Sequence, residues 1–407
     1  MSTHQRVSRV VLAYSGGLDT SVAIKWLQEK YHSEVVTVTI DVGQAENLQE
    51  ISDKANALGV IKHYPIDAKK EFVRDYIFPA IRSNALYQGK YPLSTALARP
   101  LIARKLVEVA RKEGANCISH GCTGKGNDQI RFDVTIKALA PDVEIIAPVR
   151  DWSMSRDEEI RYAQKNKIPI NAKKSIYSID QNLWGRSIEC GPLENPSIEP
   201  PASAFEWTVS PEKAPEKPQY LTIQFEKGIP IGLDGGHKDG VQLICAINKI
   251  AGDHGVGRID HVEDRIVGIK SREVYECPAA LTILEAHKDL EKIVLTRHEL
   301  SFKRGIEDQW SFMTYAGLWA DPLKKDLDAF VNETQKRVNG EVKMKLYKGS
   351  ATVVGRSSQY SLYNQNLATY DVRSKFDQSS AAGFIELWGL QTRVACLLTE
   401  SLEKKGE

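Results

Sequence analysis

The stretch SGGLDTS, residues 15–21, decides how the first part of this chain folds. Before it, the apolar and β-branched run 9–14 is typical of a buried strand. After it, apolar residues between 22 and 27 recur at helical spacing, with Asp19 and Thr20 expected as the cap and first-turn residues. Adjacent glycines let a backbone approach a ligand closely, and the free N–H groups of a helix start attract anions. The stretch therefore predicts a strand, a phosphate-binding loop and a helix.

The loop resembles the SGGxD(S/T) pyrophosphate loop of the N-type ATP pyrophosphatases (PP-loop superfamily). Residues 13–21, AYSGGLDTS, are similar to the argininosuccinate synthase family in particular. The loop has neither the Walker A spacing nor the GxGxxG spacing. Taken alone, the heptapeptide could also be a solvated strand-to-helix turn. The resemblance implies cleavage of ATP between its α and β phosphates, with ATP bound by Ala13, Tyr14, Ser15, Gly16, Gly17, Leu18, Asp19, Thr20 and Ser21.

Composition restricts the class of protein. A chain of 407 residues exceeds one ordinary core, so two domains and an appendage are expected. The chain has 54 Lys and Arg residues against 53 Asp and Glu residues, so it lacks the basic excess of a nucleic-acid binder. Small charged metabolites are therefore the expected partners. No apolar run approaches the ~18 residues of a membrane span. The six cysteines contain no CxxC pair and predict neither disulfides nor a zinc site, which fits a cytoplasmic protein with free thiols.

Residues 7–170 alternate between apolar strands and helical patterns, which predicts an α/β domain with a parallel sheet. Further strands are expected at 34–40 and 61–66, with a helix over 47–58 between them. The second strand ends at Asp41, at the carboxyl edge where open α/β sheets bind ligands. By resemblance, the backbone of Ile40 contacts adenine, although the family usually has alanine there.

The segment YPLSTALARP, residues 91–100, opens a helix expected to run to Arg111. On sequence alone, Tyr91 is most simply an aromatic residue packed at the edge of a loop. The resemblance instead assigns Tyr91, and a hydroxyl five residues later, to citrulline. That later position is Ala96, so the neighbouring Thr95 is expected to supply the hydroxyl.

A second glycine-rich stretch, SHGCTGKGNDQIRF, covers residues 119–132. It follows a short strand at 117–118, and Asn127-Asp128 is expected to cap a helix that ends at Leu139. Asp128 suits an ammonium group and Arg131 lies one turn further on, although the two could also be a surface i,i+3 ion pair worth only ~0.3 kcal/mol.

The family resemblance gives this stretch specific roles. It places Gly121 at ATP, Thr123, Asn127 and Asp128 at aspartate, and Asn127 and Arg131 at citrulline. We assign no catalytic role to His120, a strand-end residue, or to Lys125, a solvated or phosphate-facing cation.

The second domain is expected to be α+β. Residues 177–187, YSIDQNLWGRS, are predicted to be a functional loop. The pattern that follows predicts a strand over 221–225 and a helix over 241–250 that is stopped by Gly252. The charged segments 257–265 and 270–276 predict a hairpin, as do 343–347 and 352–354. Without the resemblance, the serines of the loop would be turn residues and the acidic residues part of a solvated hairpin. The resemblance assigns Ser178, Ser187, Glu263 and Tyr275 to citrulline.

Residues 377–400 form a long helical pattern that is apolar over much of its circumference. Phe384, Leu387 and Val394 share one stripe, while Ile385 and Trp388 lie outside it, so more than one packing surface is needed. The resemblance implies a homotetramer with exchanged C-terminal helices. The expected organisation is a nucleotide-binding PP-loop domain (1–170), a synthetase domain (171–364) and a C-terminal helical oligomerisation tail (365–407).

The resemblance extends over essentially the whole chain and implies a ligase of arginine biosynthesis. ATP, citrulline and aspartate would give argininosuccinate, AMP and pyrophosphate through citrullyl-AMP. No nucleophilic side chain is required, since Asp19, Asn127 and Arg131 would position the reactants and Mg²⁺ would be held by the ATP phosphates rather than by a protein metal site. Two alternatives remain at this point: another pyrophosphate-loop enzyme such as a tRNA thiolase, and a non-catalytic nucleotide-binding module.

Overall fold

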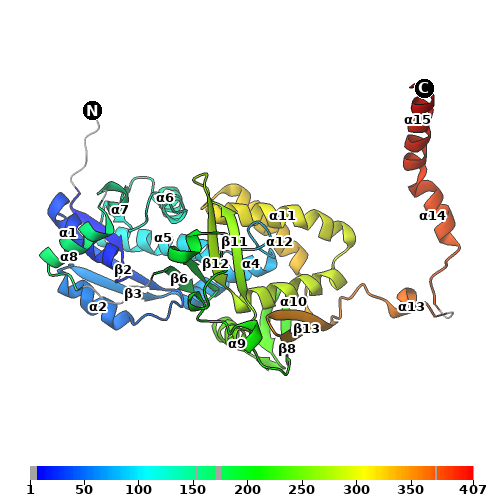
Figure 1. Cartoon of the computed structure of the whole chain (residues 1–407), viewed down its shortest axis with the longest axis horizontal. Helices are drawn as coiled ribbons and strands as arrows, with labels where there is room; N and C mark the ends of the chain where they lie inside the picture. The colour runs from blue at the N-terminus through cyan, green and yellow to red at the C-terminus, as the bar shows by residue number, and fades with distance from the viewer. Residues whose placement is uncertain (1–6, 153, 170–175, 372–373, 407) are drawn as a thin grey trace. The chain divides into compact units, whose positions relative to one another are not determined.

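The computed structural model describes residues 7–152, 154–169, 176–371 and 374–406 (Figure 1). It divides into two compact units, Met1–Tyr360 and Ser361–Glu407, which are considered separately here. The predicted boundary between residues 170 and 171 lies outside the described residues. The division into three domains therefore stays a prediction.

The first unit begins with a five-stranded sheet in the order β3-β2-β1-β4-β5, in which all pairings are parallel. Val10 of the first strand aligns with Val35 on one side and Cys117 on the other. The predicted parallel α/β sheet is confirmed. Its strands are β1 (Arg9–Ala13), β2 (Glu34–Asp41), β3 (Lys62–Asp67), β4 (Cys117–Ser119) and β5 (Glu144–Ile146).

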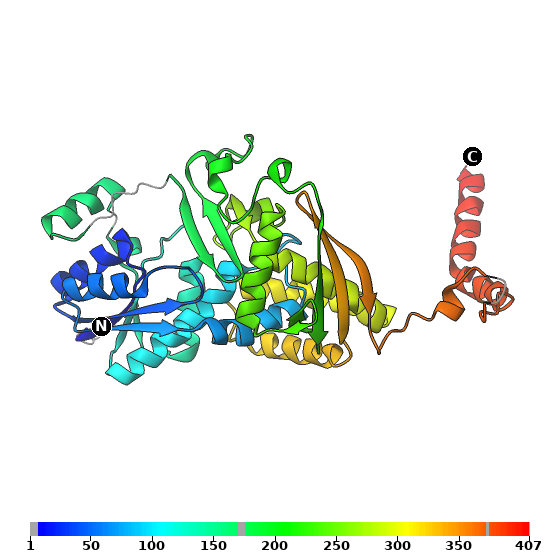
Figure 2. The ribbon, with the colours of Figure 1, turned by 90° about the horizontal axis from the view of Figure 1, so that it is seen from below.

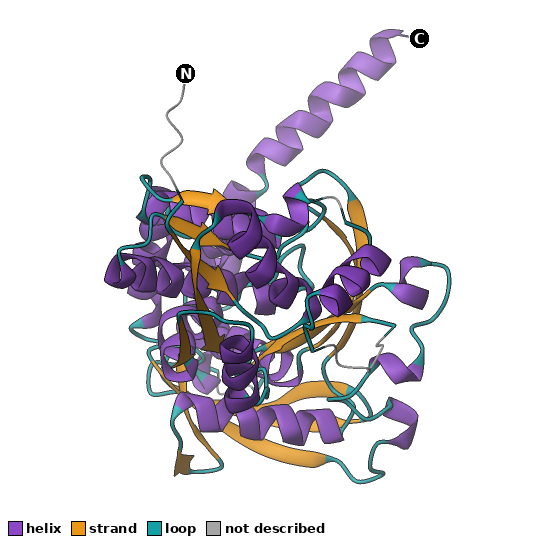
Figure 3. Cartoon of the chain, turned by 90° about the vertical axis from the view of Figure 1, so that its left-hand side faces the viewer, coloured by secondary structure: helices purple, strands orange, loops and turns teal. Residues whose placement is uncertain are grey.

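Helices cover both faces of this sheet (Figures 2 and 3). On one face, Val10 and Leu12 pack into a core with apolar residues of α1, α2 and α8. On the other face, Val11 and Ile118 join the larger core, to which α5 and α6 contribute. The helices are α1 (Leu18–Tyr31), α2 (Leu48–Ala57), α5 (Ser94–Glu113), α6 (Asp128–Leu139) and α8 (Arg156–Lys165), with the shorter α3 (Lys69–Phe72), η1 (Val73–Ile77), α4 (Phe78–Arg82) and α7 (Pro148–Asp151) between them.

Helix α1 starts earlier than the sequence suggested. Its N-cap is Gly17, which is extended (φ −69°, ψ 173°) and makes no side-chain cap hydrogen bond. The prediction of Asp19 as the cap was wrong, because Asp19 lies inside the first turn, whereas Thr20 lies in the first turn as predicted. The N-cap glycine has no side chain with which to cap the N–H groups of the first turn.

Two antiparallel sheets follow, with strand orders β11-β12-β7-β6 and β10-β9-β8-β13-β14. The turn between β6 and β7 is joined to the end of β2 by a 3.0 Å hydrogen bond from Leu183 N to Val42 O, which holds this hairpin at the carboxyl edge of the parallel sheet. The strands are β6 (Ser178–Asn182), β7 (Gly185–Glu189), β8 (Gln219–Glu226), β9 (Ile229–Leu233), β10 (Gly236–His237), β11 (Arg258–Asp264), β12 (Lys270–Glu276), β13 (Gly340–Tyr347) and β14 (Ser350–Ser357).

The predicted hairpins are confirmed as β11–β12 and β13–β14. The helix predicted to stop at Gly252 instead includes it, because α9 runs from Gly240 to Asp253. The remaining helices of this unit are α10 (Pro278–Val294), α11 (Arg297–Tyr315) and α12 (Pro322–Gln335), with short 3₁₀ turns η2 (Gly191–Glu194), η3 (Ala202–Ala204) and η4 (Pro211–Lys213).

The second unit contains α13 (Gln365–Ala368), α14 (Ser380–Trp388) and α15 (Leu390–Gly406). The prediction of one continuous helix over 377–400 was wrong, because the helix begins at Ser380 and is interrupted at Gly389. Phe384, Leu387 and Trp388 are 56, 77 and 72% exposed. Across the described parts of the whole chain, no helix is both long and apolar enough to cross a membrane.

Candidate functional site

A cavity of about 1080 Å³ lies at the carboxyl ends of the parallel strands and is also lined by β6, β7, β11 and β12. Nearly all of the residues predicted as site residues line it. The exception is Ser21, which is fully buried behind the loop and pairs with the Tyr14 hydroxyl at 3.2 Å. The lining residues from the predicted set are Ala13, Tyr14, Ser15, Gly16, Gly17, Leu18, Asp19, Thr20, Ile40, Tyr91, Thr95, Gly121, Thr123, Asn127, Asp128, Arg131, Ser178, Ser187, Glu263 and Tyr275.

The glycine loop forms one end of the cavity. Gly16 has φ +76°, a left-handed conformation that favours glycine. Ser15 Oγ lies 3.2 Å from Thr20 Oγ1 and accepts a 3.3 Å hydrogen bond from Gly17 N. The loop thus combines hydroxyls with the open N-terminus of α1, which is an arrangement suited to phosphate.

Two cations that the sequence analysis did not identify lie beside this loop. Lys54 Nζ donates a 2.6 Å hydrogen bond to Gly16 O, and Arg156 pairs with Asp19 and, at 3.2 Å, with Glu159. Both Lys54 and Arg156 line the cavity. They provide positive charge where a polyphosphate would lie.

Gly121 brings the second glycine-rich stretch against the first. A Cβ added at Gly121 would lie 3.0 Å from Thr20 Cγ2. This spacing is tighter than an ordinary Cβ contact, and both loops line the same end of the cavity. The resemblance had assigned residues 13–21 and Gly121 to ATP, and the structure brings Gly121 against the first loop.

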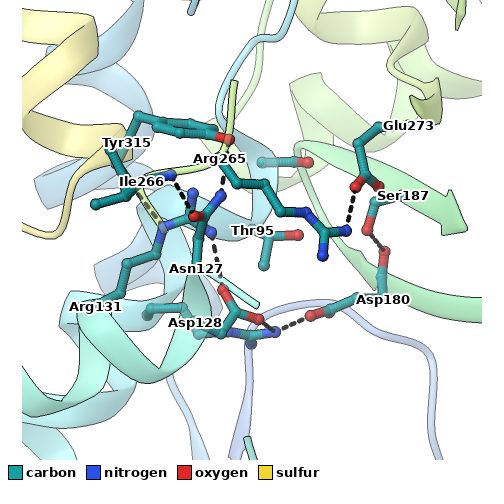
Figure 4. Close-up of polar contacts among 12 residues, drawn as sticks. Thr95, Asn127, Asp128, Arg131, Asp180, Ser187, Arg265, Ile266, Glu273 and Tyr315 are labelled. Carbon is teal, nitrogen blue, oxygen red and sulfur yellow. Dashed lines mark hydrogen bonds and ion pairs between the residues drawn. The ribbon is translucent and has the colours of Figure 1, made fainter. Parts of the chain in front are cut away.

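Asp128 lies at the centre of a charged cluster (Figure 4). Its carboxylate accepts 2.8 Å hydrogen bonds from Arg99 and from Arg131, and Arg99 also pairs with Asp180. Burial raises the pKa of Asp128, but the two guanidiniums more than offset that effect and the pKa lies below its ordinary value. The i,i+3 pair considered from the sequence exists, but it lies on a cavity wall, with the Arg131 side chain only 5% exposed.

Asn127 is the N-cap of α6, but its side chain makes no cap hydrogen bond, contrary to prediction. Its amide Nδ2 donates to the Tyr315 hydroxyl at 2.7 Å, and its Oδ1 accepts from Ile266 N at 2.9 Å (Figure 4). Tertiary partners from α11 and the β11–β12 turn have displaced the local cap. Asn127 therefore joins three segments at the cavity wall.

Tyrosines surround the Glu263 carboxylate. It accepts hydrogen bonds from Tyr275 at 2.7 Å and Tyr315 at 2.5 Å, and the Tyr275 ring stacks on Tyr91 with a centroid separation of 4.2 Å. Burial is the main cause that raises the pKa of Tyr91 to about 12 and that of Tyr275 well above its ordinary value. Tyr91 is 2% and Glu263 3% exposed, so neither is the loop-edge or solvated side chain that sequence alone favoured.

The hydroxyls expected at citrulline are distributed around this region. Thr95, not Ala96, lies on the cavity wall, and its Oγ1 is buried with no hydrogen-bond partner among the described residues. Ser187 Oγ donates to Asp180 O at 3.2 Å, while Ser178 is exposed at the start of β6. A buried hydroxyl without a partner is costly, so Thr95 is suited to a ligand.

His120 lies directly after β4 and Lys125 lies on the surface, which are the positions that the sequence predicted for them. His120 is fully buried, pairs with Asp133 at 2.7 Å and stacks on Phe132. Lys125 is exposed. Neither side chain is arranged as a nucleophile or as its activating base.

Several residues that line or support the cavity wall were missed. Arg99 and Asp180 lie within the quoted motifs 91–100 and 177–187, so the motifs themselves could have identified them. Arg265 pairs with Glu189 and Glu273, both at 2.6 Å, and burial is the main cause that raises the pKa of Glu273. Tyr315 lies outside every motif we quoted, and only the tertiary fold brings it to Asn127.

The residues at the loop fit a nucleotide rather than a directly bound metal. Within the described ranges, no group of three or more His, Cys, Asp and Glu side chains is placed to hold a metal ion. The glycines and hydroxyls of residues 15–20 instead form an open, polar cradle. Mg²⁺, if present, would be bound chiefly by phosphate oxygens and water.

Comparison with known proteins gives matches over both halves of the chain. Residues 9–169 match the arginosuccinate synthase N-terminal HUP domain, and residues 177–395 match the arginosuccinate synthase C-terminal domain. Three curated relatives named argininosuccinate synthase are similar over nearly their full length. That of Pyrococcus furiosus is 59% identical (95% of this chain, 94% of the relative), that of Rubrobacter xylanophilus 58% (95% and 94%) and that of Dictyoglomus turgidum 58% (96% and 98%).

Proposed function

The chain belongs to the argininosuccinate synthase family, and from this we propose how its cavity carries out the family's reaction. The chain is a ligase that condenses citrulline with aspartate, using ATP, in arginine biosynthesis. The full-length relatives leave no support for the tRNA thiolase or the non-catalytic nucleotide-binding module as alternatives.

One observation supports our assignment of residues to substrates. Segments far apart in the sequence, within residues 13–20, 91–102, 120–132, 178–189 and 263–275, all contribute to the lining of one cavity. The ATP set lies at the glycine-loop end, and the citrulline set includes the tyrosine and glutamate cluster. The proposed aspartate set, Thr123, Asn127 and Asp128, is on the second glycine-rich stretch, which contributes Gly121 to the ATP end.

We place the ATP triphosphate at residues 15–20 and at the N-terminus of α1, with the base near the backbone of Ile40. Lys54 and Arg156 would add positive charge beside the phosphates, and Asp19 would help to position them. Mg²⁺ would enter on the phosphate oxygens and neutralise part of their charge. Gly121 would allow the second loop to approach the nucleotide.

Citrulline would lie against Tyr91, Thr95 and Tyr275. Glu263 carries a carboxylate suited to its α-amino group, and Asn127, Arg131, Ser178 and Ser187 complete the proposed set. Thr95 Oγ1 would gain there the hydrogen bond it lacks in the protein.

Two steps follow from this arrangement. The citrulline ureido oxygen attacks the α-phosphorus of ATP, the bond to the β-phosphate breaks, and pyrophosphate leaves. The aspartate amine, having lost a proton, then attacks the ureido carbon, and the carbon–oxygen bond breaks to release AMP. The protein's contribution is positioning and charge neutralisation, because both leaving groups come from ATP.

Isotope labelling tests this route. Citrulline carrying oxygen-18 in its ureido group should transfer the label to AMP, and pyrophosphate rather than phosphate should appear. Recovery of unlabelled AMP would contradict the citrullyl-AMP intermediate.

We also propose that the chain assembles as a homotetramer through its exposed apolar C-terminal helices. The large exposed side chains of α14 support this, since isolated helices with such a surface are normally covered in an assembly. A cytoplasmic location remains a prediction from composition.

A further inference from the structure

Arg99 lies on the cavity wall next to the proposed aspartate site. It belongs to α5, and its side chain is 15% exposed. Its Nη2 contacts Asp128 Oδ2 at 2.8 Å and also pairs with Asp180. Its Nε is buried and has no hydrogen-bond partner among the described residues. Arg99 lines the cavity, and its guanidinium is not fully hydrogen-bonded within the described part of the protein.

The charges of the proposed aspartate site do not balance without a further cation. Aspartate brings two carboxylates and one ammonium group. Thr123, Asn127 and Asp128 offer a hydroxyl, an amide and a carboxylate, so they can hold the ammonium but supply no positive charge. A carboxylate removed from water needs charged or multiple hydrogen-bond donors. The cation must come from a neighbouring side chain.

The guanidiniums of Arg99 and Arg131 both contact Asp128, but they differ in how many of their N–H groups already donate hydrogen bonds to the protein. Arg131 is 4% exposed, donates from Nε to Tyr315 O at 2.9 Å, and lies over the Tyr315 ring at 4.9 Å. It is also assigned to citrulline. The hydrogen bonds of Arg99 to other described residues involve Nη2 alone. Arg99 is therefore the better placed of the two to receive a new anion.

We propose that Arg99 binds a carboxylate of the substrate aspartate and thereby determines the preference for an acidic amino acid. This inference rests on the proposed function, since it assumes that aspartate occupies the site beside Asp128. Planar guanidinium donors match carboxylate geometry, so the charge and the fork shape both contribute.

The test compares Arg99→Gln with the unsubstituted protein in steady-state assays. The KM for aspartate should rise at least about tenfold, while the KM values for citrulline and ATP change less than about threefold. In the absence of aspartate, citrulline-dependent exchange of labelled pyrophosphate into ATP should persist in the variant. An unchanged aspartate KM, or equal losses for all three substrates, would overturn the role of Arg99. Absence of exchange in the unsubstituted protein would instead count against the adenylation route.

Asp180→Asn is the matched control, because it removes a contact of Arg99 but keeps the guanidinium charge. If Arg99 binds substrate, this variant should leave the aspartate KM unchanged or lower it, since a competing carboxylate is gone. A tenfold rise in both variants would show that Arg99 acts only by joining α6 to β6. If Arg99→Gln fails to fold, Arg99→Lys is used in its place. It should raise the KM for aspartate selectively, and the absence of a selective rise would overturn the proposal.

Discussion

Individual residues show how two carboxylates in one cavity acquire different chemistry. Asp128 lies between two guanidiniums, with the Arg99 and Arg131 contacts both at 2.8 Å. Glu263 accepts instead from two phenol hydroxyls. Asp128 and Glu263 are both carboxylates, so their different proposed roles, toward aspartate for Asp128 and toward citrulline for Glu263, follow from their different neighbours.

At this scale we predict that Asp128→Asn weakens aspartate use far more than citrulline or ATP use. Loss of one partner of a desolvated charge pair typically costs ~2 to 5 kcal/mol, which corresponds to tens-fold or more in affinity. Steady-state kinetics with each substrate varied in turn measures the effect. Glu263→Gln is the reciprocal control and should raise the citrulline KM with a smaller effect on aspartate. Identical kinetic profiles for the two variants would show that the carboxylates do not divide the substrates.

Among the elements, α10 and α12 meet the segment after α4 at one buried histidine. Asn84, two residues beyond the end of α4, contacts His287 Nδ1 of α10 at 2.6 Å, and Gln335 of α12 contacts His287 Nε2 at 2.8 Å. The imidazole is fully buried. The imidazole therefore joins α10 to α12 and to the segment that follows α4.

Burial is the main cause that lowers the pKa of His287 from 6.5 to about 4. Glu291, 4.0 Å away, acts in the opposite direction, and the nearby cations Lys303 and Arg82 lower the pKa further. Because the folded pKa is the lower one, the unfolded chain binds the proton first as pH falls. Above pH 6.5 the imidazole is neutral in both states and folding carries no protonation cost from His287. As pH falls from 6.5 towards 4, the unfolded chain takes up the proton and the free energy of unfolding decreases.

We predict a stability loss from this one group on the order of 2 kcal/mol at pH 5 relative to neutral pH. Urea unfolding at pH 7.5 and pH 5 measures it. His287→Gln, which cannot titrate, should lose less stability than the unsubstituted protein over the same interval. Equal losses in the two proteins would contradict the prediction.

For the whole molecule, the C-terminal unit contains apolar surface that its own fold does not cover. The exposed side chains of α14 include Phe384, Leu387 and Trp388. Each large apolar side chain that becomes buried contributes ~1.5 to 3 kcal/mol, so a few of them suffice to hold subunits together.

We predict that truncation after Phe376 yields dimers, monomers or aggregates while the parallel-sheet domain stays folded. Light scattering gives the assembly state, and circular dichroism shows whether the remainder is folded. Truncation after Glu400, which leaves α14 and most of α15 in place, is the control and should keep the assembly of the full chain. A soluble tetramer unchanged by the longer deletion would rule out the proposed role of the tail.

The parallel sheet, its glycine loops and the hairpin of β11 and β12 could all be predicted from the amino-acid sequence. These depend on local signals: β-branched runs, glycine turns and helical spacing act within a few residues of one another. The sequence also located most of the cavity wall, because the family motifs include those residues. Which side chains within the motifs contact one another depends instead on how distant segments pack. The Asn127 side chain does not cap α6 as expected, because it hydrogen-bonds to α11 and to the β11–β12 turn. Glu263 is buried although its segment of sequence is charged. Tyr315 joined the site from outside every motif, because a contact between distant segments depends on packing that no local pattern encodes.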